Sequence, residues 1–161
     1  MVNQQGGCLC GKLRYAVHAQ PVRVWVCHCR FCQRATGSAY LIDPHFEQGD
    51  FELLAGAPTT YAHRSAGSGR MLNIHFCDAC GTKLYLTFEH HSRIGVFGGT
   101  FDAPGWFDAS GENTAHIFLS SARPGIVVPA GVECFEERPV TPEGVPVPPS
   151  VHDKPYAIAP D

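Results

Sequence analysis

The feature that most constrains this chain is a run of three cysteines within six residues. The run reads Cys27-His28-Cys29-Arg30-Phe31-Cys32. Three thiolates at this spacing can face one zinc ion, yet they fill only three of its four ligand positions. Zinc sites that only stabilise a fold have four protein ligands, whereas catalytic sites keep one position for water or substrate. The run therefore predicts a metal site with an open position.

Two further pairs of cysteines lie far apart in the chain, and each pair is directly followed by glycine. They are Cys8-Leu9-Cys10-Gly11 and Cys77-Asp78-Ala79-Cys80-Gly81. Two such short turns can meet face to face and give one closed zinc site. Glycine suits the turns because it adopts positive φ and lets backbone N–H groups approach the thiolates. We expect a structural zinc ion held by the four cysteines of these pairs, Cys8, Cys10, Cys77 and Cys80.

The fourth ligand of the three-cysteine site stays open at this point. Cys134 is the cysteine outside both groups, and a free cysteine most often behaves as a small apolar core residue. His63, His75 and His116 are the other candidates. His28 is held between two ligands and is expected to point away from the metal.

Length and composition favour one globular domain. The chain has 161 residues, 44% hydrophobic and 17% charged, and no apolar run approaches the roughly 20 residues that cross a bilayer. We therefore expect no membrane association. Residues 1–7 lack the basic and apolar parts of a secretory signal. This predicts a cytoplasmic location, where eight cysteines favour metal binding over disulfides.

Charge is small overall but unevenly distributed. The net charge of -3 gives no reason to expect nucleic acid as a partner, yet residues 1–42 carry five basic and no acidic side chains. A cationic region around the thiols would favour a small anionic ligand. Arg30 and Arg34, at and just beyond the three-cysteine run, are the candidates for binding its carboxylates. The alternative is that both are solvated surface charges.

Short apolar runs separated by glycine and proline predict an all-β fold of short antiparallel strands. No apolar period of 3.6 residues persists for three turns. The strand at 38–42 is expected to end at Asp43-Pro44. The full set of expected strands is 12–17, 21–26, 38–42, 51–55, 59–63, 71–76, 82–88, 93–97 and 116–120, with a long loop at 98–113.

The last segment, residues 138–161, holds seven of the thirteen prolines and shows no core pattern. This composition is typical of an extended tail, here following a zinc-binding domain at 1–137. We expect apolar side chains to fix the tail to the domain or to a neighbouring chain. The candidates are Val145, Val147, Val151 and Tyr156.

These motifs together resemble a known family. Gly7 to Gly11, Cys27-His28-Cys29 with Cys32, Thr36-Gly37-Ser38, Phe76 to Thr82, Gly99 to Asp102 and His116-Ile117 are similar to the glutathione-dependent formaldehyde-activating enzyme family, which includes centromere protein V. The resemblance spans about residues 6–123. It implies a single-domain β-tent fold with a structural zinc on the two cysteine pairs. It also implies a second zinc on Cys27, Cys29 and Cys32, where glutathione and formaldehyde are joined into S-hydroxymethylglutathione.

The ligand set favours a particular chemistry. Three thiolates give Zn²⁺ a net charge of -1, so it is a poor Lewis acid for activating water. Such a zinc suits a substrate thiol, held as thiolate, that attacks a small aldehyde. We therefore expect a carbon–sulfur lyase or synthase whose catalytic centre is Cys27, Cys29 and Cys32, with an N–H or hydroxyl of Thr36 to Ser38 stabilising the oxyanion.

Two other functions remain open from the sequence. In one, both zinc ions are structural and the protein is a binding module. A fourth ligand from the protein at the second zinc site would favour this function. In the other, Cys27, Cys29 and Cys32 form a thiol redox sensor that makes disulfides when metal is lost. The sequence also leaves open the physiological thiol and the role of the tail. The chain could be a monomer or a homodimer.

Overall fold

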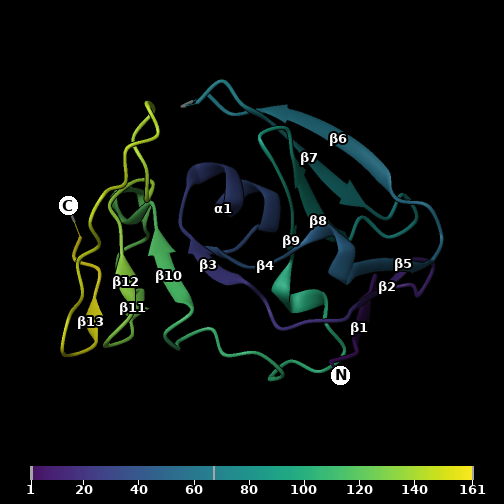
Figure 1. The fold of residues 1–161 in the computed structure, drawn as a ribbon, viewed down its shortest axis with the longest axis horizontal. Helices are drawn as coiled ribbons and strands as arrows, with labels where there is room; N and C mark the ends of the chain where they lie inside the picture. Colours follow the sequence, from purple (N-terminus) through teal and green to yellow (C-terminus); the bar gives the residue numbers. More distant parts are fainter. Residues whose placement is uncertain (1, 67, 161) are drawn as a thin grey trace. The chain divides into compact units, whose positions relative to one another are not determined.

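The computed structural model describes residues 2–66 and 68–160, which form short strands joined by turns (Figure 1). The α-helix α1 spans only Arg30–Thr36. The all-β fold class is thereby confirmed. Among the described residues, no helix has the length and apolar character that crossing a bilayer requires. The strands are β1 Gln4–Gly7, β2 Arg14–Val17, β3 Arg23–Cys27, β4 Leu41–Phe46, β5 Phe51–Ala55, β6 Thr59–Arg64, β7 Met71–Phe76, β8 Lys83–Phe88, β9 His91–Val96, β10 Thr114–Ile117, β11 Val127–Val128, β12 Glu133–Cys134 and β13 Tyr156–Ala157, and the 3-10 turns are η1 Gln48–Asp50, η2 Gly98–Thr100 and η3 Leu119–Ser121.

The chain divides into two compact units. Unit 1 comprises Met1–Arg23 and Asp43–Phe107, and unit 2 comprises Val24–Ile42 and Asp108–Asp161. In unit 1, β1, β2 and β5 form one sheet in that order, and β4, β9, β8, β7 and β6 follow one another in a second. Figure 1 shows β6 to β9 side by side. All these pairs are antiparallel, as the sequence predicts.

The core of unit 1 forms around the strand that leaves the first cysteine pair. Leu13, Tyr15 and Val17 are fully buried, so the apolar alternation seen in the sequence points inward. Tyr15 stacks on Phe51 and meets Phe101 edge to face, each with ring centroids 5.4 Å apart. Burial of these side chains fixes the start of β2 and therefore the turn that carries the first cysteines.

Strand β1 escapes sequence-based prediction because Gln4-Gln5-Gly6-Gly7 shows no apolar alternation. It pairs with β2 over its whole length, with Gly6 opposite Tyr15. A Cβ atom at Gly6 would lie 2.3 Å from Tyr15 Oη and 2.5 Å from the Thr100 carbonyl oxygen. Glycine is therefore required at this position for the strand to approach its neighbours.

In unit 2, β10 lies between β3 and β12, and both pairs run parallel. Ile117 of β10 is opposite Cys27 of β3, and His116 is opposite Cys134 of β12. The pattern of short strands does not predict this parallel pairing, because nothing in either segment marks a partner about 90 residues away. The pairing places the end of β3, where the three-cysteine run begins, beside the end of β10.

The C-terminal ends of two predicted strands differ from the structure by more than one residue. Strand β4 does not end at Asp43-Pro44 but runs through Pro44 to Phe46. Proline is tolerated in a strand where its missing N–H is not needed for the ladder. Strand β10 ends at Ile117 instead of residue 120, because Phe118 takes a left-handed conformation with φ 60°.

Three of the four side chains expected to fix the C-terminal segment to the domain or to a neighbouring chain do not pack into the single chain. Val145, Val147 and Val151 are exposed. Tyr156 does pack as expected, since it contacts the apolar cluster of unit 2 together with Ile158. That cluster contains the buried side chains of Leu119, Val128, Val132 and Cys134.

Backbone hydrogen bonds, and not the valine side chains, hold the C-terminal segment in place. Ser150 and Cys134 exchange two of them, with N···O distances of 2.9 and 3.0 Å. The Ile158 N–H donates to the Ile126 carbonyl at 2.8 Å, next to the β11–β13 pair. Because the backbone is extended and needs no particular side chains, a proline-rich composition is compatible with this order. The separation into a domain at 1–137 and a tail at 138–161 stays a prediction.

Candidate metal centres

The two distant cysteine pairs meet in unit 1. Cys8 and Cys10 follow β1, while Cys77 and Cys80 lie in the turn between β7 and β8. The four Sγ atoms all lie within 4.8 Å of one another. Sγ of Cys10 is 3.6 Å from that of Cys8 and 3.7 Å from that of Cys77. This group, here the four-cysteine cluster, can hold a metal ion with four protein ligands.

Each pair is shaped by the glycine that follows it. Gly11 has φ 76° and donates its N–H to the Cys8 carbonyl at 3.0 Å, and Gly81 has φ 73° and donates to the Cys77 carbonyl at 2.8 Å. In both turns the glycine after the second cysteine adopts positive φ, as the sequence predicts, and its N–H closes the turn onto the first cysteine. In the first turn the Leu13 N–H also donates to Cys8 Sγ at 3.2 Å, which stabilises a thiolate there.

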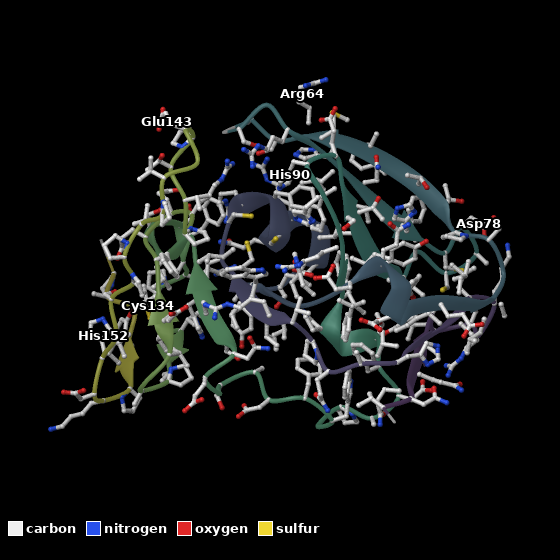
Figure 2. The ribbon with its side chains drawn as sticks, viewed as in Figure 1. Arg64, Asp78, His90, Cys134, Glu143 and His152 are labelled. Atoms are coloured by element: carbon white, nitrogen blue, oxygen red, sulfur yellow. The ribbon has the colours of Figure 1, made fainter. Side chains whose placement is uncertain are left out.

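Contacts between the two turns reinforce the four-cysteine cluster. Lys12 donates to Asp78 at 2.6 Å, and Figure 2 shows Asp78 at the outer end of the β7–β8 hairpin. The Leu9 N–H donates to the Thr82 hydroxyl oxygen at 3.2 Å. A hydrogen bond between Thr82 and Cys80 Sγ, 3.2 Å apart, lowers the pKa of Cys80 to about 5. This turn therefore favours the ionised thiol that a metal ion needs.

The three-cysteine run forms a second cluster, in unit 2. Cys27 ends β3, Cys29 is the N-cap of α1, and Cys32 lies in the first turn of that helix. Their Sγ atoms are within 4.8 Å of one another. Hydrogen bonds with the Cys27 and Cys32 thiols lower the pKa of Cys29 to about 3, while the shared bond with Cys29 raises the pKa of buried Cys27. A negative charge is thus stabilised at Cys29, the most accessible of the three.

Among residues 2–66 and 68–160, no fourth side chain joins the three-cysteine cluster. Cys134 is buried in the apolar cluster of unit 2, where it receives a weak hydrogen bond from the Tyr156 hydroxyl at 3.9 Å. The interpretation of Cys134 as a core thiol is therefore confirmed. His63 and His75 belong to β6 and β7 of unit 1, where His75 stacks on Tyr85.

His28 and His116 form a buried pair that does not belong to the three-cysteine cluster. His28 is fully buried, and its Nε2 lies 3.1 Å from Nδ1 of His116. Burial lowers the pKa of each ring to about 4. His28 thus points away from the cluster as expected, and His116 contacts His28 instead of a metal ligand position.

Gln33 has a structural role that the sequence analysis missed. Its side chain is buried, and its Nε2 donates to the His28 carbonyl at 2.6 Å and to the Ser121 carbonyl at 2.8 Å. These bonds join the cysteine run to η3. A glutamine four residues after Cys29 has no signature of its own in the sequence. The signal that could have found it is position, since side chains four residues apart lie on the same face of a helix.

Arg30 and Arg34 lie on the exposed side of α1, one helical turn apart. Arg30 donates to the Gln33 side-chain oxygen. No described residue forms an ion pair with Arg34. Of the other basic residues in 1–42, Lys12 pairs with Asp78 and Arg14 with Asp102. The helix that carries Cys32 therefore presents two cations with no carboxylate bound to them among the described residues.

The end of α1 offers fewer free donors than the sequence suggested. The Thr36 hydroxyl donates to the Cys32 carbonyl at 2.7 Å, and the Gly37 N–H donates to the Gln33 carbonyl at 2.9 Å. The Ser38 N–H donates to the Thr36 hydroxyl oxygen at 3.1 Å. The prediction of an oxyanion-stabilising N–H within 36–38 is therefore wrong, because the helix terminus uses those groups itself. The Ser38 hydroxyl remains.

Comparison with known proteins agrees with this geometry. The family described as glutathione-dependent formaldehyde-activating enzyme matches residues 3–121, well over half of the chain. Among solved structures, a crystal structure of a Rhodobacter sphaeroides protein is similar with a TM-score of 0.50 and 21% sequence identity. The similarity covers 68% of this chain and 97% of that one. At this level of identity it supports the fold.

Proposed function

Because this chain belongs to the glutathione-dependent formaldehyde-activating enzyme family, we propose that it joins a thiol of the glutathione type to a small aldehyde such as formaldehyde. The product is a hemithioacetal like S-(hydroxymethyl)glutathione, and the reverse reaction is a carbon–sulfur lyase reaction. The reaction takes place at the three-cysteine cluster. The observation that carries the proposal is that Cys27, Cys29 and Cys32 converge without a fourth ligand from the described residues.

The metal of both clusters is Zn²⁺ in this proposal. Soft thiolate ligands select zinc over harder ions. Four thiolates about 2.3 Å from one zinc ion would place their sulfur atoms about 3.8 Å apart. The Cys8–Cys10 and Cys10–Cys77 separations of 3.6 and 3.7 Å support this assignment for the four-cysteine cluster. That cluster then has a structural role and the three-cysteine cluster keeps one position for substrate.

The chemistry follows from the ligand set. A zinc ion with three thiolate ligands would hold a substrate thiol in its ionised form at neutral pH. The sulfur lone pair then forms a bond to the aldehyde carbon, and the carbonyl π electrons move to oxygen, which takes a proton from water. The Ser38 hydroxyl, which has no hydrogen bond in the described structure, is the donor we propose for that oxygen.

Other residues of this chain bind and orient. Gln33 holds the cysteine run against η3 through its two carbonyl contacts. Arg34, with Arg30 beside it, binds a carboxylate of the glutathione-type thiol on the exposed side of α1. The eight cysteines, all free thiols in this structure, suit a reducing compartment, so we propose the cytoplasm as the site of the reaction.

Thiol binding is tested with the cobalt-substituted protein, because cobalt reports its ligands in the visible spectrum. Adding glutathione is expected to change the cobalt absorption bands, whereas S-methylglutathione, which lacks a free thiol, is expected to leave them unchanged. An identical spectrum with and without glutathione would contradict thiol ligation. Turnover is measured separately by exchange NMR with labelled formaldehyde, where Cys29→Ser is expected to reduce the exchange rate to the uncatalysed level.

A further inference from the structure

Strand β6 forms an open edge of the larger sheet in unit 1. It is the last strand in the order, and among residues 2–66 and 68–160 it pairs only with β7, from Thr59 opposite Phe76 to Arg64 opposite Met71. Figure 1 shows β6 along the outside of β7 and β8, and Figure 2 shows Arg64 near its C-terminal end. The strand is exposed at every position except His63, which is half-buried. One side of its backbone therefore faces solvent.

Two hydrogen bonds show which backbone groups face outward. The Ser65 N–H donates to the Arg70 carbonyl at 2.9 Å, which sets the alternation of bonded pairs between β6 and β7. Met71, which lies opposite Arg64, accepts a hydrogen bond from the Glu89 N–H on the other side of β7 at 3.2 Å. Its backbone groups therefore point away from β6, which agrees with this alternation. The N–H and C=O groups of Thr60, Ala62 and Arg64 consequently point away from β7.

This edge lacks the features that usually prevent strands from pairing with other chains. Edge strands are commonly protected by proline, lysine, inward-pointing charges or bulges. Strand β6 contains neither proline nor lysine, and its register with β7 shows no shift. Its charged side chain, Arg64, is at the end and not at the centre. The edge is therefore available for a further strand.

We propose that β6 of a second copy of this chain occupies the edge, antiparallel to the first and with the two-fold axis at Ala62. In this register Ala62 faces Ala62 of the partner subunit. Thr60 faces Arg64 of the partner subunit, and Tyr61 faces His63 of the partner subunit. All outward N–H and C=O groups of Thr60, Ala62 and Arg64 then meet their complements on the other strand.

The sequence of β6 is complementary to itself in this register. The arginines lie opposite threonines, so no like charges face each other, and two small alanine side chains meet at the axis. Tyr61 and His63 lie on the same side of the strand with ring centroids 6.3 Å apart. Pairing brings them beside the same two rings of the partner, and cross-strand aromatic pairs stabilise sheets. Tyr61, which is 55% exposed, loses contact with water there.

The oligomeric state of the full-length chain tests the proposal. An interface built on one strand pair lies at the small end of specific interfaces, so sedimentation velocity is measured over a concentration series. The average mass is expected to rise from monomer toward dimer. Ala62→Lys, which opposes two like charges at the axis, is expected to remain a monomer, while Ala103→Lys at another exposed alanine behaves like the parent chain. A parent chain that stays monomeric, or an Ala62→Lys chain that still dimerises, would overturn the proposal.

A cross-linking experiment tests the register independently. Ala62→Cys places two thiols opposite each other at the axis, and mild oxidation is expected to link them into a disulfide that peptide mass spectrometry identifies. Thr60→Cys is the matched control, because residue 60 of one strand lies about 13 Å along the strand from residue 60 of the other. That separation exceeds the roughly 7 Å between Cα atoms that a disulfide tolerates. Equal linkage of the two variants would refute the register.

Discussion

Gly6 illustrates how a single residue decides whether β1 can join unit 1. A Cβ atom there would meet Tyr15 Oη at 2.3 Å and a backbone oxygen at 2.5 Å. Gly6→Ala is therefore expected to lower the free energy of unfolding by about 1–3 kcal/mol, measured by urea denaturation. Gly49→Ala, at a position with nothing within 4 Å, is the control and should change stability by less than about 0.5 kcal/mol. Equal effects would show that the close approach is not what constrains Gly6.

Arg34 is the residue on which substrate recognition depends in the proposed function. Arg34→Gln is expected to raise the KM for glutathione about 3- to 10-fold with little change in kcat, because one exposed charge-assisted contact is lost. The KM for 2-mercaptoethanol, which has no carboxylate, should stay constant. Arg64→Gln on β6 serves as the control variant. A KM that rises equally for both thiols would mean that Arg34 does not bind the carboxylate.

At this scale the sequence is most informative where chemistry restricts the residue type. Cysteine spacing and the glycines that follow it allow both clusters to be predicted, and the structure brings those thiols together. Gln33 could not be predicted, because an amide side chain is common on protein surfaces. One of its two acceptors, the Ser121 carbonyl, lies 88 residues further along the chain.

At the scale of elements, Gln33 connects the cysteine run to η3, and the strength of metal binding should depend on that connection. Gln33→Met removes both hydrogen bonds and leaves the His28 and Ser121 carbonyls without this donor. The expected result is about tenfold weaker metal retention at the three-cysteine cluster, measured by competition with a chelator. Gln48→Met in the exposed turn η1 is the control. Unchanged retention in Gln33→Met would show that the run keeps its shape unaided.

The turns after β1 and between β7 and β8 depend on each other through the four-cysteine cluster. Cys77 is fully buried, and Cys77→Ser is expected to cost about 4 kcal/mol or more of unfolding free energy, because the proposed metal binding there would contribute to folding. Native mass spectrometry should show one metal ion fewer per chain. Cys134→Ala should keep the full metal content. Retention of both metals by Cys77→Ser would contradict the assignment.

Most strands could be predicted, and the failures have physical reasons. Short apolar runs such as β5 and β7 have the bounds that the sequence predicts. Strand β1 has no alternation, because close contact with Tyr15 replaces side-chain packing. The helix α1, with seven residues, is too short to show a helical apolar period.

At the scale of the whole molecule, stability should depend on pH through the half-buried His91. Burial, with His90 nearby, holds the pKa of His91 at about 4, below its ordinary value of 6.5. Between these values the unfolded chain binds a proton that the folded chain does not, so stability falls as pH decreases from about 6.5 to 4. His91→Gln should reduce this loss, measured by urea unfolding at pH 4.5 and 7. The exposed His152→Gln should not, and an unchanged pH dependence in His91→Gln would contradict the expectation.

The arrangement of the whole chain was the least predictable from the sequence. The parallel pairs around β10 join segments that have no local sign of each other. Val145, Val147 and Val151 are exposed, and the C-terminal segment is held by backbone hydrogen bonds, which no side-chain pattern in the sequence marks.

The two clusters differ in how far apart their cysteines lie along the chain, and this fixes the order in which they can form during translation. Cys27 to Cys32 leave the ribosome together, whereas Cys10 must wait for Cys77, 67 residues later. At about 5–20 residues per second, Cys77 follows Cys32 by about 2–9 s. A nascent chain can therefore load the three-cysteine cluster before its four-cysteine cluster exists. The cysteines synthesised first, Cys8 and Cys10, become part of the cluster completed last.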